Sequence, residues 1–161
     1  MDDDGLSTSG WSYVGAYALW AVSVAASVLV GLLVQSALVQ MATIAALDTA
    51  GDPGAALDAS LRIRFGDVWS YMLMGLILVA VVVFVEYWYR TGVEMGRLLA
   101  RFLRVTVFQV ALLFVVHSLY FAVARATGIS SWSAIYVPLA ELAGLLLCAF
   151  AYGRVRQPDK G

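Results

Sequence analysis

The chain alternates long stretches of apolar residues with short charged segments. No Asp, Glu, Lys or Arg occurs at positions 11–47, 68–85 or 105–124, and positions 132–153 contain a single charged residue, Glu141. A helix rises 1.5 Å per residue, so about 20 apolar residues cross a hydrocarbon core of roughly 30 Å. The pattern therefore predicts an all-α integral membrane protein. We expect one four-helix bundle domain over residues 11–153, with transmembrane spans at about 13–39, 68–89, 105–124 and 132–153.

A basic junction at residues 90–104 separates the second and third expected spans. Its arginines are Arg90, Arg97, Arg101 and Arg104. The aromatic residues Tyr87, Trp88 and Tyr89 precede it, as is typical of the headgroup level of a membrane. We expect the four arginines to contact anionic lipid, and Arg90 to pair with Glu86 one turn earlier.

The distribution of basic residues predicts the orientation. Four of the ten Lys and Arg residues lie in the junction and three in the tail at 154–161, so seven lie on one side and three on the other. Cytoplasmic loops carry the excess of Lys and Arg. The expected location is the plasma or inner membrane of the cell, with several spans and with both termini in the cytoplasm.

Three hydrophilic segments flank the expected spans. Residues 1–10 carry three acidic and no basic residues and are expected to be a disordered tail. Residues 48–67 form the expected outer loop, in which Asp52 and Pro53 suit the start of one short helix. Residues 154–161 form a basic cytoplasmic tail. No domain outside the membrane is expected.

Composition excludes several classes of protein. Hydrophobic residues make up 62% of the chain and charged residues 13%, far from the soluble average. One cysteine and one histidine cannot form an internal disulfide, a thiolate-rich metal site or a two-histidine haem site within one chain. We predict no catalytic residue, no metal site and no nucleic-acid partner. No cofactor is expected, although His117 could bind a pigment, haem or quinone as a single ligand.

Small and polar residues recur every four positions in the first expected span, at Ser23, Ser27, Gly31 and Gln35. This spacing places them on one helix face, where another helix can approach closely. We interpret Ser23, Ser27 and Gly31 as a helix-packing seam. The alternative interpretation is that these residues form part of a polar pathway through the membrane.

Glu141 and His117 are the ionisable residues expected at membrane depth. His117 lies thirteen residues after Arg104 and Glu141 thirteen residues before Arg154, so both lie about 20 Å along their helices from the basic side. Because a short turn joins these spans as antiparallel neighbours, we predict a hydrogen bond between the two side chains. Pro138, three residues before Glu141, is expected to bend the fourth span.

The candidate further members of this polar group are Gln109, Tyr120, Ser27 and Gln35. Such a group can be a structural contact, or it can carry a proton or a cation.

Three functions remain open at this point. The first is a non-catalytic subunit or scaffold that packs with other membrane proteins or with itself. The second is an oligomeric transporter or channel for protons or small ions that uses His117 and Glu141. The third is binding of a pigment or quinone at His117. The first is the leading hypothesis, since the sequence contains no nucleophile constellation and no nucleotide-binding fingerprint.

Overall fold

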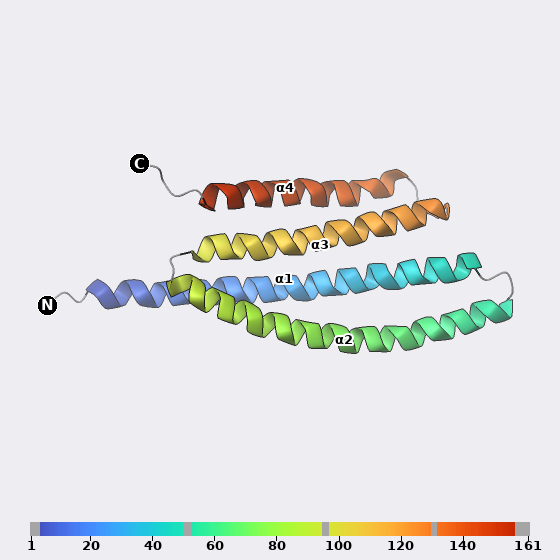
Figure 1. Ribbon diagram of the computed structural model, residues 1–161, viewed down its shortest axis with the longest axis horizontal. Coiled ribbons are helices and arrows are strands. Elements are labelled where there is room, and N and C mark those ends of the chain that lie inside the picture. Colours follow the sequence, from blue (N-terminus) through green and yellow to red (C-terminus); the bar gives the residue numbers. More distant parts are fainter. Residues whose placement is uncertain (1–3, 50–52, 95–96, 130–131, 157–161) are drawn as a thin grey trace.

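The computed structural model describes residues 4–49, 53–94, 97–129 and 132–156, and all of its regular structure there is helical. The elements are α1 (Asp4–Thr49), α2 (Pro53–Glu94), α3 (Leu98–Ala126), the 3₁₀ turn η1 (Trp132–Ile135) and α4 (Tyr136–Arg156). Consecutive long helices run antiparallel (Figure 1). The described part of the chain is therefore all-α, as predicted.

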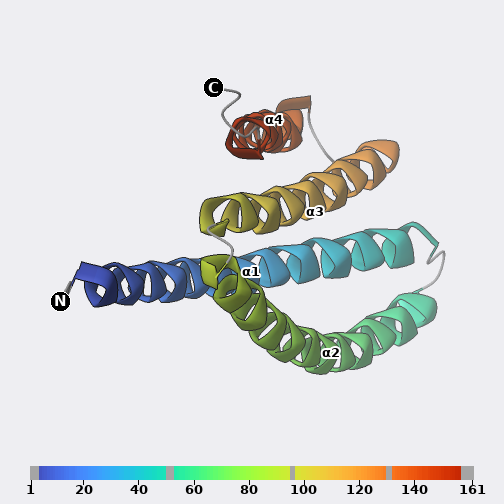
Figure 2. The ribbon, with the colours of Figure 1, turned by 60° about the vertical axis from the view of Figure 1, so that its left-hand side comes forward.

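The four long helices form an open row in the order α4, α3, α1, α2 (Figures 1 and 2). α1 packs against α2 on one side and against α3 on the other, and α4 packs mainly against α3. α2 bends away from α3 along its middle (Figure 2). The four helices are compatible with the expected bundle, in which α2 and α4 lie at the two edges.

Each long helix contains a segment long and apolar enough to cross a membrane. These segments are Ser12–Ala46, Val68–Val93, Leu98–Ala126 and Tyr136–Val155. They support a multi-pass membrane protein with four spans. The beginning of α1, the junction of α2 with α3 and the end of α4 lie at the same end of the row (Figure 1).

A small apolar core lies where α1 meets α3. Val30, Val34 and Ala37 of α1 pack with Val116 of α3, and Met41, Leu113 and Tyr120 complete the cluster. Many other large apolar side chains are exposed, as expected where the solvent is lipid. Packing in this core fixes the central pair of helices.

Two expected irregular segments are helical instead. Residues 4–10, expected to be disordered, form the first turns of α1. The helix expected to begin at Pro53 within the outer loop does begin there, but it is not short and continues through 67 as the first turns of α2. The strong helix formers Ala55, Ala56, Leu57 and Ala59 let α2 extend beyond its apolar part, and Pro53 is its first residue. The predicted cap at Asp52 and residues 1–3 and 157–161 lie outside the described residues.

Pro138 does not bend a transmembrane helix, contrary to expectation. α4 begins at Tyr136 after η1, so Pro138 is its third residue. Backbone N–H groups in the first turn have no partner within the helix, so proline removes no hydrogen bond there.

The turn after α3 closes with a glycine at φ 74°, Gly128. The N–H groups of Gly128 and Ile129 donate to the carbonyls of Arg125 and Ala124 at 3.1 and 3.0 Å. This is a Schellman motif, which satisfies the last carbonyls of a helix. It ends α3 within a short turn, so that α4 can return along it.

Candidate functional site

His117 of α3 and Glu141 of α4 meet between two of the apolar helices. His117 Nδ1 lies 2.5 Å from Glu141 Oε1, and the two side chains are 19% and 16% exposed. The structure therefore brings together the two residues that the sequence places at equal depth. Their contact joins the edge helix α4 to the central helix α3.

The second oxygen of the Glu141 carboxyl, Oε2, is buried and has no hydrogen-bond partner within the described part of the chain. Burial of an unpaired carboxylate oxygen is costly, and no donor among the described residues reaches this one. One proton shared between Oε1 and Nδ1 leaves the pair without net charge. The arrangement can therefore hold a proton in a short hydrogen bond between α3 and α4.

A second polar contact joins the same two helices nearer the basic end. Arg104 of α3 donates from Nη2 and Nε to the hydroxyl of Tyr152 in α4, at 2.7 and 3.3 Å. Between the two contacts, a Cβ added to Gly144 would lie 4.0 Å from a methyl of Val110. α4 is thus held at two levels about 20 Å apart along α3, with close helix contact between them.

Neutral polar groups form a separate cluster among α1, α2 and α3. Ser23, 1% exposed, shares a 2.8 Å hydrogen bond with the hydroxyl of Tyr89. Gln109 of α3 donates from Nε2 to the Ser23 carbonyl at 3.1 Å and to the Ser27 hydroxyl at 2.7 Å. Ser27 in turn donates to the Ser23 carbonyl at 2.8 Å. This cluster ties the three helices together around Ser23.

The rest of the small-residue seam faces α2. A Cβ added to Gly31 would lie 3.0 Å from Met74 Sδ, so a larger residue at this position would require the Met74 side chain to shift. Gln35, 3% exposed, donates from Nε2 to the Ser70 hydroxyl at 3.0 Å. The predicted packing seam therefore lies between helices of the same chain.

The predicted further members of the His117 group separate in the structure. Gln109 and Ser27 belong to the cluster around Ser23, Gln35 lies against Ser70, and Tyr120 packs on the apolar core. Eight residues of helix turn the direction of a side chain by about 80°, so Gln109 faces α1 while His117 faces α4. The polar residues of α3 therefore contact two different helices.

The junction arginines differ in what they contact. Arg101 donates to the Trp88 carbonyl and to the Thr91 hydroxyl, and its guanidinium lies 4.7 Å from the centre of the Trp88 ring. Arg101 thus holds the end of α2 against α3. Arg90 lies 4.0 Å from Glu86, as predicted, and Arg97 is exposed. Contact of these arginines with anionic lipid stays a prediction.

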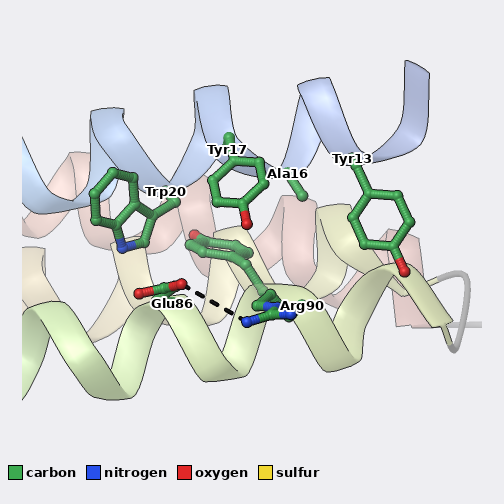
Figure 3. Close-up of a pocket in the computed structure, with 7 residues that line it drawn as sticks. Tyr13, Ala16, Tyr17, Trp20, Glu86 and Arg90 are labelled. Atoms are coloured by element: carbon green, nitrogen blue, oxygen red, sulfur yellow. Dashed lines mark ion pairs between the residues drawn. The ribbon is translucent and has the colours of Figure 1, made fainter. Parts of the chain in front are cut away.

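A small hollow lies between α1 and α2 at this basic end (Figure 3). Tyr13, Tyr17 and Trp20 of α1 face the ion pair of Glu86 with Arg90 across it. Its volume of about 10 Å³ admits no more than a single water. The hollow is therefore too small for an organic ligand.

A much larger groove of about 1060 Å³ lies over α1 between α2 and α3. Sequence analysis missed it, because it arises from the bend in α2. Most of its wall is apolar, Ser27, Gln35, Ser70 and Gln109 line it as polar groups, and Arg104 with Trp88 line it at the basic end.

Among the described residues, no group of three or more His, Cys, Asp or Glu side chains could hold a metal ion. Glu141 occupies one ring nitrogen of His117, so an axial ligand role would fall to Nε2. Comparison of the chain with protein-family models, curated proteins and solved structures finds no match.

Proposed function

We propose that this chain is a non-catalytic membrane subunit or scaffold that packs with other membrane proteins or with copies of itself. The observation that carries this proposal is the open row of helices, in which α2 and α4 are edges. A membrane helix that has neighbours on one side only offers its other side to lipid or to a partner helix. Both termini are proposed to be cytoplasmic, as the excess of basic residues at that end favours.

The edge helix α4 is the proposed interface. Leu146, Leu147 and Phe150 are exposed on it by 62%, 71% and 64%. In the small-residue seam of α1, Ser23 contacts Tyr89 and Gly31 lies against Met74 of the same chain, so the seam is proposed to serve packing within the chain. Assembly is therefore proposed to use apolar side chains at the edges of the row.

Photo-crosslinking in native membranes tests this proposal. A benzoylphenylalanine at Leu147 of α4, or at the equally exposed Leu76 of α2, should give a discrete adduct with another chain. The matched control is Leu119 of the central helix α3, which is 54% exposed and should give lipid adducts alone. Absence of a discrete protein adduct at both edge positions would contradict the proposal.

Proton or small-ion transport is the second candidate, and the His117 to Glu141 contact favours it. A 2.5 Å contact between two ionisable groups at membrane depth is suited to passing a proton. Against it, Leu113 packs in the apolar core between Gln109 and His117, so the two polar groups of α3 are separated. Transport predicts pH-driven flux in liposomes that is lost in Glu141→Gln; a scaffold predicts no flux in either protein.

A further inference from the structure

We propose that the groove between α2 and α3 binds an anionic glycerophospholipid, with the phosphate at Arg104 and an acyl chain along the apolar wall. The proposal is independent of the assembly proposed above, which uses the outer edges of the row. It rests on the shape of the groove and on the polar groups at its basic end.

The groove has the dimensions of an acyl-chain site. Its lining residues on α3 run from Arg104 to Leu112, about 12 Å of helix, and those on α2 cover about 33 Å, so the groove is long enough for an acyl chain of one leaflet. α1 forms its floor and α2 its far wall, from Gly66 to Trp88. Within a bilayer such an apolar groove must be filled, because an empty space of this size loses its packing contacts.

The basic end carries donors suited to a phosphate. Arg104 is exposed and spends two N–H donors on Tyr152, so the other N–H groups of its five can reach a ligand. Its guanidinium lies 5.7 Å from the centre of the Trp88 ring. Trp88 Nε1 is buried and has no hydrogen-bond partner within the described part of the chain. A phosphate oxygen and a guanidinium form a strong charge-assisted hydrogen bond.

The acidic groups nearby do not oppose this charge within the groove. Glu86 faces the small hollow on the α1 side and lies beside Arg90. Arg101 adds a second positive charge next to Trp88, at 4.7 Å from its ring. Charge complementarity therefore favours an anionic lipid over a neutral one, and over an apolar helix.

Quenching of tryptophan fluorescence by brominated lipid tests the site. The full chain is reconstituted in vesicles that contain either phosphatidylglycerol or phosphatidylcholine with the same brominated chains. The difference between wild type and Trp88→Phe isolates the signal of Trp88 among the five tryptophans. We expect stronger quenching by phosphatidylglycerol, and a decrease of this preference by about fivefold in Arg104→Gln.

Three controls make the result specific. Arg97→Gln removes an exposed charge outside the groove and should keep the preference, as should Arg104→Lys, which retains the charge. Tyr152→Phe removes the internal partner of Arg104 and should also keep it. Equal quenching by the two lipids overturns the proposal. Quenching by neither lipid shows that no acyl chain lies beside Trp88, and loss of the preference in excess inorganic phosphate shows a site for free phosphate; both results overturn the proposal.

Discussion

The two sides of α3 use polar residues in opposite ways. Towards α1 and α2, Gln109 joins neutral groups of three helices, centred on Ser23 with 1% exposure. Towards α4, His117 meets one ionisable partner, Glu141, whose second oxygen has no partner in the described part of the chain. The first is a distributed network and the second a single contact between two helices.

The neutral network and the ionisable pair therefore have different roles in the molecule. A neutral network in lipid satisfies its own donors and acceptors and fixes the relative positions of helices. An ionisable pair depends on its protonation and on each partner being present. We therefore expect substitutions in the network to disrupt the three-helix core, and substitutions in the pair to affect the attachment of α4.

The largest effect is expected for Ser23→Leu. It forces a larger side chain into a site with almost no free space and removes the partner of the Tyr89 hydroxyl. Overpacking and a lost buried hydrogen bond together should cost about 3 kcal/mol or more in the free energy of unfolding. Steric trapping in bicelles measures this, with Val22→Leu, 56% exposed, as the neutral control. A stable Ser23→Leu variant would show that the network is not the centre of the core.

A smaller but non-additive effect is expected for the pair. His117→Leu leaves the Glu141 carboxyl without its partner and should cost about 2 to 3 kcal/mol in the free energy of unfolding. Adding Glu141→Leu should recover much of that cost, because the unpaired group is then gone. A double-mutant cycle by steric trapping tests this. Simple addition of the two single effects would mean that the side chains do not interact.

Gln109→Leu should destabilise by about 1 kcal/mol. It removes two hydrogen bonds to α1, and hydrogen bonds between membrane helices average about 0.6 kcal/mol. The loss stays small because Ser27 still donates to the Ser23 carbonyl. The same unfolding measurement applies, with Phe108→Leu at a 71% exposed position as the control. A cost as large as that of Ser23→Leu would make Gln109 the organising residue.

The smallest effect is expected for Arg90→Gln. The ion pair with Glu86 spans 4.0 Å, and its side chains are 62% and 42% exposed. Exposed pairs one helical turn apart contribute less than about 0.5 kcal/mol. Thermal unfolding in detergent should be nearly unchanged, at low and at high salt. A large change would indicate that Arg90 has a further partner in the membrane.

The sequence predicts the membrane helices and the His117 to Glu141 contact for simple reasons. Uncharged stretches of sufficient length identify helices in lipid, and antiparallel neighbours joined by a short turn place residues of equal depth together. Gly128 makes that turn short. These features depend on one helix or on one pair of consecutive helices, so they can be predicted from the composition of each segment and from the number of residues between positions.

Features that depend on the order of the helices in space are not predictable in the same way. Spacing groups Gln109 with His117 on α3, but only the position of α1 beside α3 shows that they face different helices. The bend of α2 and the groove beneath it likewise have no sequence signal. The predicted start of a helix at Pro53 agrees with the structure. The predictions of a disordered tail at 4–10 and of only a short helix within 53–67 differ from it, because the charged and turn-forming residues there are compatible with helix.

The mass of the intact particle tests the central proposal most directly. The chain is extracted from its native membrane in lipid nanodiscs, and the proteins in each disc are identified and weighed by native mass spectrometry. A membrane subunit or scaffold predicts a fixed stoichiometry of this chain with a partner chain or with its own copies. A single chain in every disc, together with proton flux that Glu141→Gln abolishes, would contradict the proposal and establish transport by the monomer.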